Sequence, residues 1–181
     1  MGKLILGEDV VLHEGRYVRL MKRPFVNQET GEAGHWEFVH RKIHGRIVAV
    51  VAITPKREVV LIKIFRVPLG KYIIEPCAGL PDQPGEDEVV LAHRELLEET
   101  GYVCDKLTPI MAGPFNAGLN ADEIVFYLGI DARRVAQPKL ESAEDIEVVL
   151  VPDTSLVSFL ANPPAGVAVD VKLWSIVPFV L

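Results

Sequence analysis

The chain has 181 residues, a length that fits one domain with room for a small appended element. Hydrophobic residues make up 49% of it and charged residues 24%, values typical of a globular protein that buries its own core. The formal net charge of −6 argues against a nucleic-acid-binding surface, which requires clustered Lys and Arg, but it does not exclude a small anionic ligand.

The cysteine content and the hydropathy of the chain indicate where in the cell the protein is located. Cys77 and Cys104 are the only cysteines, which fits a reducing compartment better than a disulfide scaffold. The N-terminal segment lacks an apolar signal region, and apolar runs such as 174–181 are too short to span a bilayer. We therefore expect a soluble cytoplasmic protein that contacts neither nucleic acid nor membrane.

The first third of the chain is typical of β-strands. One strand is expected over residues 10–21 and another over 35–44, joined by the polar turn at 27–34. Residues 47–53 and 59–65 are β-branched runs on either side of a Thr-Pro-Lys-Arg segment. They predict a hairpin whose strands are buried on both faces.

A glycine loop and a helix occupy the centre of the chain. A short strand over 73–76 leads into the loop 79–85, whose prolines and glycines exclude a helix. A helix is expected from about Glu86 to Thr100, ended by Gly101.

The last third alternates strands with short helices. Strands are expected over 124–130 and 146–151, and a short helix before the Asn-Pro-Pro at 162–164. A final helix is expected over 168–177, stopped by Pro178. Many strands with two or three helices predict an α/β sandwich around a mixed sheet.

The central helix carries an unusual number of carboxylates: Glu86, Glu88, Glu95, Glu98 and Glu99. Three of them precede Gly101, at the helix end where the macrodipole disfavours acids, and Glu95 and Glu99 are like charges four residues apart. Arg94 can pair with Glu98 on the next turn. A solvated acidic face is one interpretation. The electrostatic cost of placing these acids together favours a second interpretation, in which they bind Mg²⁺ or Mn²⁺ for phosphate chemistry.

The segment 79–102 resembles the Nudix box, G-x5-E-x7-R-E-U-x-E-E-x-G-U, in which U is a bulky apolar residue. Glu86, seven further residues and the run RELLEETGY at 94–102 match the pattern. Six residues instead of five separate Gly79 from Glu86, so the loop holds one extra residue.

The resemblance extends to the ADP-ribose and nucleotide-sugar pyrophosphatase branch of that family. The similar segments are Trp36–Val39, Phe65–Pro68, Ile74–Leu80 and Glu144–Glu147. This resemblance implies the Nudix α/β/α sandwich with a mixed β-sheet, plus N-terminal antiparallel strands. The domains would be a dimer-forming β-strand element at 1–44 and a Nudix hydrolase domain at 45–181.

The resemblance also assigns a metal site and its support. The implied metal ligands are Glu95, Glu99, Glu98 and the backbone carbonyl of Ala78. The implied supporting residues are Gly79, which lets the backbone approach, Glu86, which supports the loop and metal waters, Arg94, which orients the glutamates, and Gly101, which ends the helix.

A glutamate from the late acidic loop is expected to activate the water or hold a metal, beside Glu99. Glu144 is the first choice and Glu141 the second, with an exposed acidic loop as the alternative for either. Arg66 is a candidate for a phosphate contact, although surface pairing is nearly as well supported, and Glu75 for a base or ribose contact.

Trp36 and Phe38 are two residues apart on a predicted strand, so they share a face. Stacking on a nucleobase would make them substrate-binding residues. Packing in the core or in a dimer is an equally good interpretation.

The implied activity is Mg²⁺-dependent hydrolysis of the pyrophosphate bond of ADP-ribose or a related nucleoside diphosphate sugar. The products would be a nucleoside monophosphate and a sugar phosphate, and the implied assembly is a homodimer. GDP-mannose, ADP-glucose and dinucleoside polyphosphates are alternative substrates. An alternative of another class is a non-catalytic nucleotide sensor, which the complete set of box glutamates disfavours.

Overall fold

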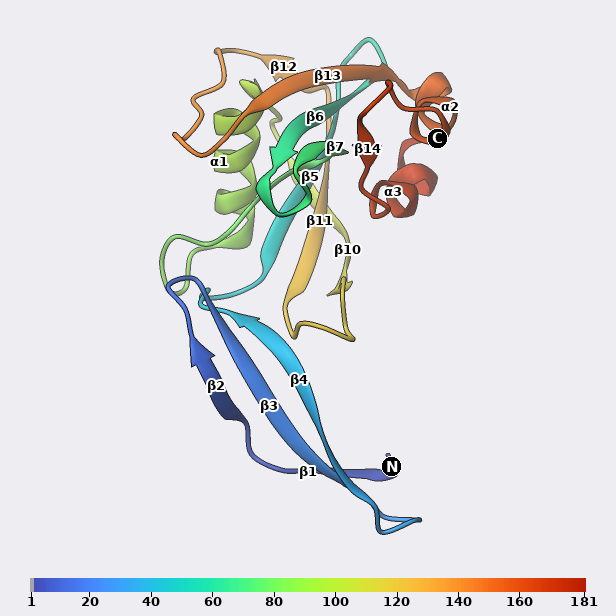
Figure 1. Cartoon of the computed structure of the whole chain (residues 1–181). Coiled ribbons are helices and arrows are strands. Elements are labelled where there is room, and N and C mark those ends of the chain that lie inside the picture. Colours follow the sequence, from blue (N-terminus) through green and yellow to red (C-terminus); the bar gives the residue numbers. More distant parts are fainter. Residues whose placement is uncertain (1) are drawn as a thin grey trace.

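In the computed structural model, which describes residues 2–181, an N-terminal antiparallel sheet extends away from a larger mixed sheet (Figure 1). The N-terminal sheet contains β1 (Leu4–Leu6), β2 (Val10–Glu14), β3 (Val18–Asn27) and β4 (Ala33–Arg41). The mixed sheet contains β5 (Ile47–Ile53), β6 (Glu58–Arg66), β7 (Lys71–Glu75), β8 (Cys77–Gly79), β10 (Leu107–Pro114), β11 (Glu123–Ile130), β13 (Ile146–Pro152) and β14 (Ala168–Val169). A two-stranded sheet pairs β9 (Tyr102–Val103) with β12 (Arg133–Arg134).

Helices cover both faces of the mixed sheet, which confirms the predicted α/β/α sandwich (Figure 1). Helix α1 (Glu88–Thr100) lies on one face, and α2 (Leu156–Ala161) and α3 (Leu173–Val180) lie on the other. Single turns of 3-10 helix occur at η1 (Val67–Leu69) and η2 (Asp153–Ser155).

Strand β5 lies at the centre of the core, and all seven of its residues are buried. Val48 and Val50 pack in the cluster that contains α1, whereas the alternate residues Ala49 and Val51 pack in the cluster that contains α2 and α3. This alternation follows from the two-residue period of a strand. The prediction that this strand is buried on both faces is confirmed.

The predicted hairpin of β5 and β6 forms only at its closed end. Its register joins Ala52 to Val60 and Ile53 to Val59, after which the two strands diverge. Strand β8 then pairs with β5, and β7 pairs with β6. Pro76 separates β7 from β8, and its missing N–H suits a position where the chain changes partners. The divergence leaves room for β8, whose Ala78 amide is hydrogen-bonded to Glu99 of α1.

Helix α1 begins two residues later than expected. Asp87 is its N-cap, and the Asp87 carboxylate accepts hydrogen bonds from the amides of Val89 and Val90. Gly101 ends the helix in the left-handed conformation, with φ of 75°, as predicted.

Several other elements differ from the sequence-based expectation, and the strands β1, β9, β10 and β12 were not predicted. The strand expected over 10–21 is broken at residues 15–17 into β2 and β3. The prediction of a helix over 168–177 was wrong at both ends. Residues 168–169 form β14, and α3 runs from Leu173 to Val180 with Pro178 inside it. Burial of Leu173, Ile176 and Val180 against the sheet outweighs the hydrogen bond that Pro178 cannot make.

The N-terminal sheet is attached to the rest of the chain through β4. The Val39 amide donates to the Leu119 carbonyl at 2.7 Å, and the Trp36 indole N–H donates to the Gly118 carbonyl at 2.9 Å. Arg41 forms an ion pair with Asp122 at 3.0 Å. These contacts tie the sheet to the loop between β10 and β11.

Candidate active site

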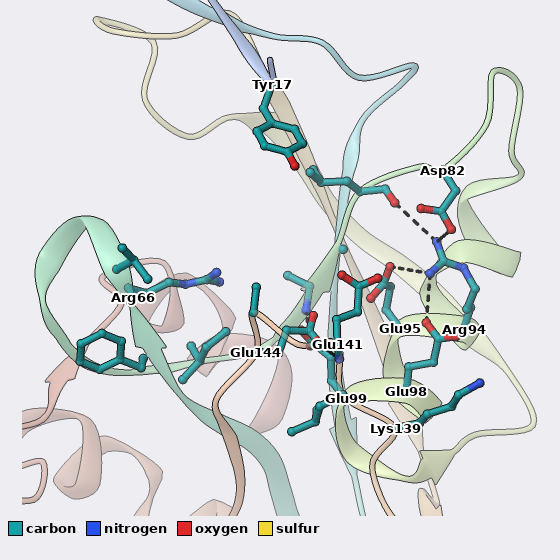
Figure 2. Close-up of a pocket in the computed structure, with 18 of the residues that line it drawn as sticks. Tyr17, Arg66, Asp82, Arg94, Glu95, Glu98, Glu99, Lys139, Glu141 and Glu144 are labelled. Atoms are coloured by element: carbon teal, nitrogen blue, oxygen red, sulfur yellow. Dashed lines mark hydrogen bonds and ion pairs between the residues drawn. The ribbon is translucent and has the colours of Figure 1, made fainter. Parts of the chain in front are cut away.

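A pocket of about 790 Å³ opens where α1, β8, the end of β6 and the loop before β13 meet. Figure 2 shows carboxylates gathered at its centre and Arg66 reaching in from the opposite side. The acidic side chains that line it are Asp82, Glu95, Glu98, Glu99, Glu141 and Glu144. The fold therefore brings three box glutamates, Glu95, Glu98 and Glu99, together with the late acidic loop in one pocket.

Glu95 and Glu99 form the buried floor of the cluster, with 8% and 4% of their surfaces exposed. The amide of Ala78 donates a hydrogen bond to Glu99 Oε2 at 3.0 Å, which joins β8 to the helix. Gly79 lies directly against Glu95, because a Cβ at Gly79 would stand 1.9 Å from Glu95 Cδ. Only glycine leaves room for this approach.

Burial makes both carboxyl groups unusually weak acids. Burial raises the pKa of Glu95 to about 7, although the neighbouring Arg94 lowers it. Burial likewise raises the pKa of Glu99 to about 8, against the lowering effect of the Ala78 amide and with a further rise from Glu95 and Glu144. Without a cation, these two groups resist carrying charge together.

Arg94 is the cation nearest to the cluster. Its Nη1 lies 3.0 Å from Glu95 Oε1 and 3.1 Å from Glu98 Oε2, so the predicted Arg94–Glu98 pair is confirmed. Its Nε lies 3.4 Å from Glu86 Oε1, and its Nη2 lies 3.3 Å from Asp82 Oδ2. Arg94 thus holds acids of the loop and of the helix at once.

The late acidic loop presents Glu144 more directly than Glu141. Glu144 is half-buried, whereas Glu141 is exposed. The charge of Glu144 raises the pKa of both Glu95 and Glu99. The Glu141 amide donates to Glu144 Oε2 at 2.7 Å, so the backbone of Glu141 fixes the Glu144 side chain.

Arg66 and Glu75 are paired with each other. Arg66 Nε and Nη2 donate to the two Glu75 oxygens at 3.0 and 2.6 Å, a bidentate arrangement. Arg66 lines the acidic pocket, but Glu75 is buried behind it and does not. The geometry therefore gives Glu75 a contact with Arg66 where the sequence predicted a contact with a base or ribose.

Trp36 and Phe38 lie in a different place. They share a face of β4, as their spacing predicts, and line a second, mostly apolar groove of about 430 Å³ between the N-terminal sheet and the β10–β11 loop. Trp36 is 58% exposed, and Phe38 is buried. Within one chain, these aromatic residues do not line the acidic pocket.

Tyr17, Asp82 and Lys139 also line the acidic pocket, and sequence reasoning missed all three. Tyr17 belongs to the turn between β2 and β3, and Figure 2 shows it reaching over the pocket from that turn. The Lys139 amide donates to the carbonyl of Glu98 at 2.8 Å, so its loop is fixed to the end of α1. The extra residue in the loop was a local indication that Asp82 could differ from the family pattern. The positions of Tyr17 and Lys139 in the pocket depend on contacts between distant segments.

The residues of this pocket fit a divalent cation. Hard carboxylate oxygens from Glu95, Glu98 and Glu99 converge on one wall of the pocket. Glu95 and Glu99 are buried, and a bound cation would offset the energetic cost of ionising them. Among residues 2–181, no three acidic, His or Cys side chains already stand in a closed metal-binding arrangement. Arg94 Nη1 forms ion pairs with one oxygen of Glu95 and one oxygen of Glu98.

The sandwich and its carboxylate pocket provide the residue types that metal-assisted phosphate chemistry requires. Comparison with known proteins agrees: residues 43–167 match the family described as NUDIX domain. An ADP-ribose pyrophosphatase from Bacillus subtilis is 39% identical over 128 residues, which cover 70% of this chain and 66% of that enzyme. An ADP-sugar pyrophosphatase from Mus musculus is 28% identical over 190 residues, covering 96% and 86%.

A crystal structure of an ADP compounds hydrolase superposes with a TM-score of 0.80 at 19% identity, covering 99% of this chain and 92% of that one, which shows the fold. The chain belongs to the Nudix family and is a Nudix hydrolase, of the branch that contains the ADP-ribose and ADP-sugar pyrophosphatases. Within residues 2–181, no helix combines the length and apolar character that crossing a membrane requires.

Proposed function

We propose that this chain hydrolyses the pyrophosphate bond of ADP-ribose or a related nucleoside diphosphate sugar, giving a nucleoside monophosphate and a sugar phosphate. The observation that carries the proposal is the buried pair Glu95 and Glu99 in a pocket that also contains Glu144 and Arg66. Two buried carboxylates are costly unless a cation joins them, and a pyrophosphate is a natural ligand for that cation. The activities named for the Bacillus and mouse relatives support the substrate class.

The cofactor in this proposal is Mg²⁺, with Mn²⁺ as a substitute. Glu95, Glu98 and Glu99 would hold it, with the backbone carbonyl of Ala78 as a further ligand. When bound, the ion would offset charge on the phosphate oxygens and lower the pKa of a coordinated water. Arg94 would hold the glutamates in place through the ion pairs that it already makes.

The protein's own groups have distinct tasks in this proposal. Glu144 would accept the proton of the attacking water, because it faces the carboxylate cluster and its Oε1 makes no hydrogen bond within residues 2–181. Arg66 would bind a phosphate oxygen, since its guanidinium lines the pocket and Glu75 fixes its orientation. Tyr17 would contact the part of the substrate at the pocket mouth. The pocket volume falls within the range of roughly 300–1,000 Å³ typical of small-molecule sites.

The assembly in this proposal is a homodimer, with residues 1–44 as the dimerising element and 45–181 as the catalytic domain. Exposed apolar side chains on the N-terminal strands support it: Leu4, Ile5, Leu6, Val10, Val11, Leu12 and Trp36. Trp36 and Phe38 would then contribute to binding across the interface. A cytoplasmic location fits the two buried free thiols. Light scattering after size exclusion would measure the mass of the assembly.

A product-resolved screen tests the activity. The protein is incubated with Mg²⁺ and ADP-ribose, ADP-glucose, GDP-mannose or a dinucleoside polyphosphate, alongside Glu99→Gln. We expect turnover of ADP-ribose or ADP-glucose by the wild type and a loss of several orders of magnitude in the variant. No turnover of any substrate would overturn the enzymatic proposal, and binding without turnover would favour the nucleotide sensor.

A further inference from the structure

Asp145, next to the proposed base Glu144, is fixed from two directions. The Tyr72 hydroxyl donates to Asp145 Oδ2 at 2.5 Å, and the Phe65 amide donates to the Asp145 carbonyl at 3.1 Å. Strand β13 starts immediately afterwards, with Ile146 opposite Ile64. These contacts set the register in which the late acidic loop enters the sheet.

Glu144 and Asp145 lie immediately before β13, outside the strand itself, and their side chains make different contacts. The side chain of Asp145 is held by Tyr72, whereas Glu144 lines the acidic pocket. Because the two residues are adjacent, fixing Asp145 restricts Glu144, whose side chain lines the acidic pocket. The Glu141 amide completes the arrangement through its hydrogen bond to Glu144 Oε2, which leaves Oε1 free of hydrogen bonds within the described chain.

We propose that Tyr72 is a positioning residue for hydrolysis, because its hydroxyl holds Asp145 and so aims Glu144 at the reacting water. The inference rests on the proposed function, in which Glu144 accepts a proton. Tyr72 lies on β7 and does not line the acidic pocket, so it acts through the loop and not on the substrate.

The Tyr72 hydroxyl can be removed without disturbing the ring. The ring packs edge-to-face on Phe65 with centroids 5.3 Å apart, and Lys63 Nζ lies 5.2 Å from the ring centre. Phenylalanine keeps both contacts. The hydrogen bond to Asp145 is exposed, so removing the hydroxyl leaves no buried polar group without a partner. An effect of Tyr72→Phe on turnover would therefore not reflect unfolding.

The test compares Tyr72→Phe with Glu144→Gln and with the double variant. We expect kcat to fall about tenfold in Tyr72→Phe and about a hundredfold in Glu144→Gln, with KM changed less than about twofold. In the double variant, Tyr72→Phe should cost nothing further, because there is no base left to aim. Amide hydrogen exchange over residues 141–145 should be faster in Tyr72→Phe than in wild type.

Two further variants separate positioning from general structure. Asp145→Asn keeps an oxygen that can accept from Tyr72, so its kcat should stay near wild type, whereas Asp145→Ala should match Tyr72→Phe. Tyr127→Phe is the matched control, since it also removes a hydroxyl that donates to a carboxylate, that of Glu88 at 3.3 Å, outside the acidic pocket. Its kcat should be unchanged.

The outcomes distinguish this inference from the proposed function. If wild type hydrolyses no substrate, the proposed function fails and the inference with it. If wild type is active but Tyr72→Phe keeps full kcat, or loses as much in the Glu144→Gln background, the positioning role is wrong and the function stands. An unimpaired Glu144→Gln would also overturn the role of Tyr72.

Discussion

Replacing Glu99 by Gln is expected to stabilise the metal-free protein at pH 8 while removing most of its turnover. Glu99 is 4% exposed, and burial, with Glu95 and Glu144 nearby, raises its pKa from 4.5 to about 8. Glutamine removes the charge but keeps an oxygen that can accept the hydrogen bond from the Ala78 amide. The substitution therefore isolates the electrostatic cost of the site.

The sign and size of the change in unfolding free energy follow from the raised pKa of Glu99. Below pH 4.5 the carboxyl is protonated in both the folded and the unfolded chain, so it costs nothing. Between pH 4.5 and about 8 the unfolded chain loses this proton while the folded protein retains it, so the free energy of unfolding falls as pH rises. At 1.36 kcal/mol per pKa unit the ceiling is about 5 kcal/mol. We expect about 2 kcal/mol, because burying the Gln amide also carries a desolvation cost.

Thermal unfolding in EDTA at pH 5 and pH 8 measures the effect. At pH 8 the variant should unfold roughly 4–8 °C above wild type, and at pH 5 the difference should nearly vanish. Adding Mg²⁺ should raise the Tm of wild type more than that of the variant. Glu8→Gln, a change at an exposed carboxylate, is the control and should show neither effect.

Two results would refute this reasoning. A lower Tm of Glu99→Gln at pH 8 in EDTA would show that the carboxylate stabilises the fold. An equal gain at both pH values would show that packing, and not charge, is responsible.

Three other substitutions test the surrounding geometry. Gly79→Ala forces a Cβ to within 2.0 Å of Glu95 Oε1, so it should weaken Mg²⁺ binding at least tenfold in calorimetric titration. Arg94→Gln leaves the acidic cluster without its guanidinium, and denaturant titration should show a loss of about 1–3 kcal/mol that Mg²⁺ largely restores. Gly101→Ala meets a backbone carbonyl 2.2 Å away and should cost more than about 2 kcal/mol, whereas Gly31→Ala, with φ of 74° and open space, should cost about 1 kcal/mol. Equal losses at the two glycines would refute the steric argument.

Local patterns in the sequence were sufficient for the central helix. The positions of Arg94, Glu95 and Glu99 follow from helical spacing, and Gly101 ends the helix because it can take a positive φ. The continuous β-branched run of β5 likewise identified a strand buried on both faces.

Residue contacts between distant segments could not be read from the sequence. Spacing placed Trp36 and Phe38 on one face, but the pocket that they line is set by the loop between β10 and β11. The Tyr72–Asp145 hydrogen bond joins residues 73 positions apart, and nothing in either local sequence indicates it. Tyr17 reaches the acidic pocket only because the N-terminal sheet is attached beside it.

The loop that holds the extra residue between Gly79 and Glu86 is closed by contacts of Glu86 with Arg94 and with Asp82. Glu86 still lies 3.4 Å from Arg94, and its second oxygen accepts the Asp82 amide at 2.8 Å, closing the lengthened loop. Asp82 Oδ2, in the same loop, lies 3.3 Å from Arg94 Nη2. The guanidinium therefore serves acids from the loop as well as from the helix end, where the macrodipole already disfavours negative charge. Because one monovalent cation cannot compensate them all, a divalent cation at Glu95 and its neighbours would relieve the remaining repulsion.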